Sequence, residues 1–257
     1  MSLCWSYMYP MVSLPHYWCS TRSGNKIWTV GRCGKSKIDL FEFDIESHAT
    51  KEYECCFDCY FKSVLIVGNG DILYLWLTTN DLHPYTLTLF KVSTTSWEPR
   101  KMFTINATEE PSNSIIIDNK MYLVVKNPGC ELIVIDLSTE EVTRQKLEKL
   151  CDKKFTDHIV MFHNEKLHIF EDDGSRRAVF CMENETLEQL NTDDPNHTPS
   201  LYNVLYHDGV VLKQFHNSLM LEAFNFETCE WVQYDIEDYR LTTDVHWMKS
   251  FFDVNGK

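Results

Sequence analysis

Two kinds of landmark recur along the chain of 257 residues at intervals of about 45 residues. The first is a large side chain that follows a strand-like apolar run and a short polar turn. These anchors are Tyr53, Trp97, Val142, Leu187 and Trp231, spaced by 44, 45, 45 and 44 residues. Trp5 precedes Tyr53 by 48 residues and fits the same series. A fixed period of this size indicates a chain built from repeated supersecondary units.

The second landmark is an apolar strand that follows a turn rich in Gly, Asn and Asp. Such residues tolerate the positive φ angles that tight hairpins need. Each strand carries a register residue at its third or fourth position, and most of these are aromatic. The register residues are Trp28, Tyr74, Tyr122, His168 and Leu212, spaced by 46, 48, 46 and 44 residues. Two landmarks with one common period predict five repeats.

The length of the repeat predicts four short strands in each unit. Strands of ~5–6 residues would fill about half of such a unit, and four turns would fill the rest. Architectures with four strands per repeat have periods of ~40–50 residues. We therefore predict an all-β fold, a β-propeller with five complete four-stranded blades at approximately 11-55, 61-100, 112-147, 157-191 and 201-234.

The two ends of the chain are predicted to supply further strands. Segment 1-10 places Trp5 where an outer strand would end, and segment 244-257 has the pattern of an inner strand. One arrangement joins these terminal strands into a partial sixth blade that lacks its two middle strands. The other is a complete ring of five blades with both terminal strands docked on it. Both arrangements are consistent with the repeat.

The repeat resembles that of kelch proteins. Residues 24–31, Gly-Asn-Lys-Ile-Trp-Thr-Val-Gly, are similar to the polar turn and following strand of a kelch unit. Residues 40–44, Leu-Phe-Glu-Phe-Asp, and 223–231, Ala-Phe-Asn-Phe-Glu-Thr-Cys-Glu-Trp, are similar to its Tyr/Phe-Asp step and its Trp. The Gly pair of the family is reduced to Gly31. The Trp anchor is replaced at three positions, Tyr53, Val142 and Leu187. The chain is thus similar to a degenerate kelch-type β-propeller.

The resemblance to kelch proteins of the BTB–BACK–kelch class implies a protein-interaction module. In that class the propeller recruits substrates to a cullin-RING ubiquitin ligase, and we expect the same role here within a longer protein. Loops between second and third strands form part of the recognition face of such propellers. Here these loops are 32–37, 79–83, 127–129, 172–177 and 216–218. The predicted partner-binding residues are Arg32, His83, Arg176, Arg177 and His216.

Two other functions compete with substrate recognition. Kelch propellers also act as scaffolds on the actin cytoskeleton. Some secreted kelch propellers are copper oxidases, whose site needs a thiolate–tyrosine and histidine constellation together with export. Met1 to Pro10 has neither the basic region nor the apolar stretch of a signal peptide. We therefore predict that the chain is not an enzyme and has no catalytic residue, no cofactor and no metal.

Two short motifs suggest chemistry but lack part of what that chemistry needs. Gly31 to Ser36 resembles a phosphate-binding loop, which requires four residues between its glycines, whereas two separate Gly31 from Gly34. Cys56 and Cys59 form a C-x-x-C, but a structural zinc needs four ligands and usually a second such pair. Free thiols are therefore expected at these cysteines.

Charge and hydropathy limit the expected partners and compartment. The formal net charge is −14, so the average surface repels a phosphate backbone and nucleic acid is not an expected partner. A basic partner would require the acidic groups to gather in one patch. A membrane-spanning helix needs a run of about 18 apolar residues, and the sequence has no such run. A membrane partner is therefore not expected. Without a signal peptide, the chain is predicted to be cytoplasmic and its ten cysteines reduced.

Overall fold

The computed structural model describes thirteen stretches of the chain, and the prediction of an all-β fold is confirmed within them. They contain twenty strands and no helix, and hence no helix that could cross a membrane. The described residues are 19–33, 35–79, 84–108, 111, 113–127, 129–147, 158–171, 176–184, 186–191, 204–207, 210–214, 220–226 and 230–235. The predicted terminal strands, 1-10 and 244-257, lie outside these stretches.

The twenty strands form five sheets, each of four strands paired antiparallel in chain order. The first sheet holds β1 (Ser20–Ser23), β2 (Lys26–Cys33), β3 (Lys37–Asp44) and β4 (Thr50–Cys56). The second holds β5 (Ser63–Asn69), β6 (Ile72–Thr78), β7 (Tyr85–Ser93) and β8 (Pro99–Ala107). The third holds β9 (Ser114–Ile117), β10 (Lys120–Asn127), β11 (Gly129–Asp136) and β12 (Val142–Lys146).

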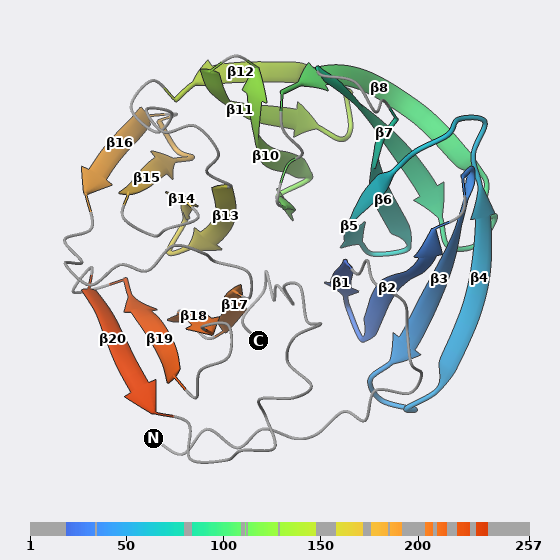
Figure 1. Ribbon diagram of the computed structural model, residues 1–257, viewed down its shortest axis with the longest axis horizontal. Coiled ribbons are helices and arrows are strands. Elements are labelled where there is room, and N and C mark those ends of the chain that lie inside the picture. Colours follow the sequence, from blue (N-terminus) through green and yellow to red (C-terminus); the bar gives the residue numbers. More distant parts are fainter. Residues whose placement is uncertain are drawn as a thin grey trace.

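The last two sheets follow the same plan. The fourth holds β13 (His158–His163), β14 (Lys166–Glu171), β15 (Arg176–Cys181) and β16 (Thr186–Asn191). The fifth holds β17 (Val204–His207), β18 (Val210–Gln214), β19 (Met220–Asn225) and β20 (Glu230–Asp235). In Figure 1 the sheets follow one another around the molecule in chain order, with β1, β5, β13 and β17 on the inner side. This arrangement is compatible with a propeller-like fold.

Tight turns join the first and second strands at the Gly, Asn and Asp positions that the sequence indicates. Gly24 and Gly70 have φ of 58° and 59°. In the third sheet both turn residues, Asp118 and Asn119, are also left-handed, with φ of 47° and 62°. Two-residue hairpins of this type need positive φ, which Gly, Asn and Asp adopt at the lowest cost. Local turn chemistry therefore sets the register of the first hairpin in these three sheets.

The register residues occupy one equivalent position in all five sheets. Each is the third residue of its second strand and pairs with the residue of the first strand that lies seven positions earlier in the sequence. In the first sheet Trp28 pairs with Thr21, and in the fifth Leu212 pairs with Leu205. The predicted period is thus confirmed at this landmark.

The anchor series is correct in three sheets and wrong in two. Val142, Leu187 and Trp231 each pair across the third and fourth strands with the residue seven positions earlier. The equivalent positions in the first two sheets are Thr50 and Pro99. Tyr53 lies three residues beyond the first of these, and Trp97 two residues before the second. A large side chain can reach the space between sheets from either the turn or the strand, so its spacing alone does not fix the register.

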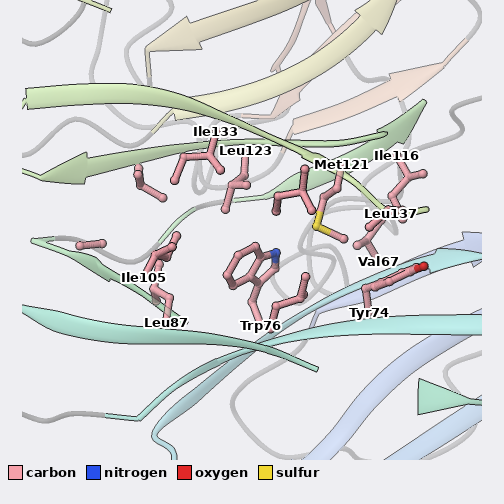
Figure 2. Close-up of a cluster of buried hydrophobic side chains, with 14 residues drawn as sticks. Val67, Tyr74, Trp76, Leu87, Ile105, Ile116, Met121, Leu123, Ile133 and Leu137 are labelled. Carbon is pink, nitrogen blue, oxygen red and sulfur yellow. The ribbon is translucent and has the colours of Figure 1, made fainter. Parts of the chain in front are cut away.

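The hydrophobic core lies between consecutive sheets. In β6, Leu73 and Leu75 pack against the first sheet, while Tyr74 and Trp76 pack against the third. Successive side chains of a strand point to opposite faces, so a middle strand buried on both faces is apolar almost throughout. Figure 2 shows Trp76 and Leu87 of the second sheet opposite side chains of the third, including Leu123. A third cluster fills the space between the third and fourth sheets in the same way.

The first strands of neighbouring sheets lie against each other, β1 on β5, β5 on β9 and β9 on β13. Side chains from one sheet bond the backbone of the next. The Oγ of Ser23 donates to the carbonyl of Gly70 (2.9 Å), and the amide of Gly68 donates to the Oγ1 of Thr21 (3.0 Å). Asn113 bonds both the amide and the carbonyl of Val160, at 2.9 and 2.8 Å. These contacts satisfy polar groups on the free edges of inner strands.

Candidate interaction surface

The turns that join first to second strands and third to fourth strands gather on one side, here called the turn face. Backbone hydrogen bonds hold the two kinds of turn together in three sheets. The amide of Ile45 donates to the carbonyl of Asn25 (2.8 Å), and that of Thr94 to Asp71 (3.0 Å). The amide of Leu137 donates to Asn119 (2.9 Å). The repetition of one bond shows that the sheets are built alike on this face.

The connections between second and third strands lie at the opposite ends of the sheets, here called the loop face. The chain also passes from one sheet to the next on this face. In the segment 57–62, between β4 and β5, the amide of Phe57 donates to the carbonyl of Ser36 (2.8 Å). The amide of Phe61 donates to Lys35 (3.2 Å), and that of Lys62 to Thr78 (2.9 Å). This segment therefore joins the second-to-third connections of the first two sheets.

Three of the five predicted partner-binding residues lie in strands at their loop-face ends. Arg32 is the next-to-last residue of β2, and Arg176 and Arg177 are the first two of β15. The strands thus extend further into these connections than the sequence predicts, because pairing continues to Cys33 with Ile38 and to Arg176 with Asn191. The register of β2 with β3 shifts between Val30 and Cys33, a bulge that changes the local twist.

The other two predicted residues, His83 and His216, lie outside the described residues. So do most residues of the second, fourth and fifth predicted loops. The described structure therefore brings Arg32, Arg176 and Arg177 to one face by topology, and their role in binding stays a prediction.

The segment 57–62 carries the most exposed large hydrophobic side chain of the described residues, which sequence reasoning missed. Tyr60 is 72% exposed, whereas Phe57 and Phe61 on either side of it are 6% and 9% exposed. The rings of Phe57 and Phe61 meet edge to face at 5.7 Å, and Phe57 meets Phe90 at 5.0 Å. The spacing of the two phenylalanines by four residues around a tyrosine was the available signal.

Exposed charged residues flank Tyr60 within the segment 57–62 and in the connection to which that segment is hydrogen-bonded. Lys35, Asp58 and Lys62 are exposed. The ammonium of Lys62 lies 3.7 Å from the ring centre of Tyr85, within the range of a cation–π contact. Lys37 pairs with Glu54 at 2.6 Å, which raises the pKa of Lys37 and lowers the pKa of Glu54. The loop-face ends of the first two sheets thus carry exposed lysines, exposed carboxylates and the exposed ring of Tyr60.

The turn face is acidic. The described turns of the first four sheets contain eight exposed carboxylates and no Lys or Arg: Glu46, Asp71, Glu98, Asp118, Glu140, Glu141, Glu165 and Glu183. Asp136, at the end of β11, accepts from the amides of Ser138 (2.8 Å) and Thr139 (2.9 Å). These two hydrogen bonds lower the pKa of Asp136, and the bond from Thr139 has the larger effect. The sequence alone indicated only that a basic partner would require such an acidic patch, and it did not locate one.

An aromatic cluster with a buried carboxylate closes the space between the first two sheets. The rings of Tyr53 and Trp97 stack at 4.1 Å, and Trp28 lies 5.8 and 5.7 Å from them. The hydroxyl of Tyr53 donates to Glu42 (3.3 Å), which is 4% exposed and also pairs with Lys26 (3.3 Å). Burial, and then the charge of Glu42, raise the pKa of Tyr53. Both contacts are made to the Oε2 atom of Glu42, and they hold the buried carboxylate within the cluster.

The cysteines correct one expectation. Cys130 is disulfide-bonded, which contradicts the expectation that all ten cysteines are reduced. Cys55, Cys56 and Cys59 are free. Burial raises the pKa of Cys55 to about 12. Among the described residues, no three His, Cys, Asp or Glu side chains lie close enough together to hold a metal ion.

The chain was compared with known proteins. No protein-family model matches it, and no curated protein matches it. The resemblance to kelch repeats therefore stands on the residues of the chain alone.

Proposed function

We propose that the chain is a kelch-type β-propeller of five complete blades that binds a protein partner through its loop face. The architecture is supported by five four-stranded sheets of one topology, and the first strands of the first four sheets lie in contact one after another. It is supported further by a core that lies between sheets rather than within one of them. The same proposal includes a partial sixth blade formed by the terminal segments.

The observation that carries the binding function is the difference between the two faces. On the turn face the chain reverses in short turns that are closed by their own hydrogen bonds. The loop face has the connections of more variable length and carries the exposed Tyr60. Binding residues are disproportionately found on such connections, held by a rigid scaffold. The predicted binding residues Arg32, Arg176 and Arg177 belong to strand ends on the loop face, and Arg is enriched at interface hot spots.

The partner that the kelch resemblance favours is a substrate of a cullin-RING ubiquitin ligase, recognised in the cytoplasm by a longer form of the protein. The test is affinity isolation with the immobilised chain, followed by mass spectrometry. The variants are Arg32→Ala and the pair Arg176→Ala with Arg177→Ala. The matched control is Glu141→Ala on the turn face.

The proposal predicts that ligase subunits or their substrates are recovered with the parent and the control, and lost with the loop-face variants. Recovery of actin in their place would favour the scaffold function. Equal recovery with all variants would contradict binding through the loop face.

A further inference from the structure

We propose that Tyr60 is the anchor residue of the partner-binding surface, and that the partner presents an acidic protein segment to it. The proposal rests on the proposed function, because it names the residue and the partner chemistry of that same face. Its basis is the conformation of the segment 57–62 and the charges beside it.

The backbone around Tyr60 is fixed in place. Phe57 and Phe61 are buried in the core between the first two sheets. The amides of Phe57, Phe61 and Lys62 all donate to carbonyls of the neighbouring connections or strands. A single exposed aromatic residue is ordinary on a protein surface. Here the residues on both sides are buried and bonded, so the exposed ring is held out from a rigid support.

This rigidity favours binding. Association loses free energy when flexible side chains and loops become ordered, and a preorganised element avoids much of that loss. Tyr has only two rotatable side-chain bonds and is among the residues most enriched at hot spots. An exposed Tyr on a preorganised segment is therefore suited to insert into an apolar pocket of a partner, with its hydroxyl at the rim.

The charge distribution selects the partner. Lys35 is exposed, and its carbonyl accepts the amide of Phe61. Lys62, two residues after Tyr60, is also exposed, with its ammonium over the ring of Tyr85. Asp58 is the one carboxylate within the segment 57–62, and Glu54 already pairs with Lys37. The described turns of the opposite face hold eight exposed carboxylates and no Lys or Arg, although one of the eight, Glu140, pairs with Arg100 of β8. An acidic segment is thus repelled by the turn face and attracted to the lysines beside Tyr60.

The experiment is selection of short random peptides displayed on phage against the folded chain. The peptides enriched on the parent are then synthesised and titrated against Tyr60→Ala, Tyr60→Phe and Lys35→Glu. The matched control is Val142→Ala, which shortens the other exposed large hydrophobic side chain of the described residues, 38% exposed at the turn face. Thermal unfolding of each variant verifies that it is folded.

The expected result is enrichment of peptides rich in Asp and Glu that also contain apolar residues. Tyr60→Ala should weaken their binding by about 30-fold, the size of a hot-spot loss. Tyr60→Phe, which keeps the ring, and Val142→Ala should change it by less than about threefold. Lys35→Glu should weaken acidic peptides because it places like charges together.

The outcomes separate this inference from the proposed function. Enriched peptides that lose binding with Arg176→Ala and Arg177→Ala, but keep it with Tyr60→Ala, would overturn the role of Tyr60 and leave the loop face as the binding surface. Enrichment of basic peptides would overturn the acidic partner. Failure to enrich any peptide, or binding that only turn-face variants reduce, would contradict the proposed function and this inference together.

Discussion

The backbone of Gly68 lies so close to Ser23 that a β-carbon added to the glycine would be 2.8 Å from the Cβ of the serine. The two residues belong to β5 and β1, the first strands of neighbouring sheets. Real β-carbons do not approach this closely, so only glycine fits at position 68. The contact is reinforced by the hydrogen bond from the amide of Gly68 to Thr21. Close packing of first strands is what a propeller requires at its inner side.

Gly68→Ala should therefore destabilise the fold by about 1–3 kcal/mol, the usual penalty for overpacking. Ser23→Gly removes the opposing β-carbon, so it should recover part of that loss in the double variant. The measurement is chemical unfolding of the single and double variants in a double-mutant cycle. Gly129→Ala is the control, because a β-carbon there meets no atom within 4 Å. Equal stability of Gly68→Ala and Gly129→Ala would refute the close contact.

The stack of Tyr53 on Trp97 should join the first and second sheets. Aromatic pairs contribute about 0.5–1.5 kcal/mol beyond their buried area, so a cycle of Tyr53→Ala and Trp97→Ala should give a coupling of that size. Each single variant should destabilise the chain more than Lys35→Ala, an exposed loop-face substitution expected within about 0.5 kcal/mol. Additive losses in the unfolding free energy would mean that the two rings do not stack in solution.

Alkylation should distinguish neighbouring cysteines. The thiolate is the reactive form, and the pKa of Cys55 is raised to about 12 by burial, whereas Cys56 is exposed. In the folded chain at about pH 8, iodoacetamide should modify Cys56 and leave Cys55 intact. Cys130 should react only after reduction. Peptide mapping by mass spectrometry measures all three. Modification of Cys55 at the same rate as Cys56 would contradict the burial of Cys55 at the end of β4.

Acid should weaken the turns that Asp136 closes. Its carboxylate accepts two backbone amides, which hold its folded pKa below the ordinary value of 3.8. A group with a lowered folded pKa stabilises the fold above its unfolded pKa and loses that contribution as pH falls through the folded value. Asp136→Asn should thus destabilise the chain near neutral pH, and the difference from the parent should shrink below about pH 4. A difference that stays constant with pH would exclude the carboxylate as its source.

Much of the fold follows from local chemistry that a sequence displays. The Gly, Asn and Asp turns fix the first hairpin of the first three sheets, so Trp28 and Tyr74 could be aligned without a structure. The third-to-fourth turns differ in where they place a large side chain. Trp97 lies in the turn with a φ of 59°, while Tyr53 lies in the strand. The two rings nevertheless stack in the space between the first two sheets. Their spacing in the sequence therefore resembled that of residues at equivalent positions of two repeats.

The interaction surface could be predicted only by topology. Alternation of four strands is enough to send the second-to-third connections to one face, with Arg32 and Arg176 at their edges. The exposure of Tyr60 depends on the burial of Phe57 and Phe61 between two sheets, which no local pattern specifies. The acidic turn face likewise depends on hydrogen bonds between turns that lie 18 or more residues apart in the sequence.

The most direct test of partner binding through the loop face is hydrogen–deuterium exchange of the chain with and without a peptide selected as above. Amides slowed by the peptide mark the surface that it covers. The account predicts slower exchange in 35–37 and 57–62, and no change in the turns 45–49, 94–98 and 137–141. Protection of those turns, with no effect on the loop-face segments, would contradict it.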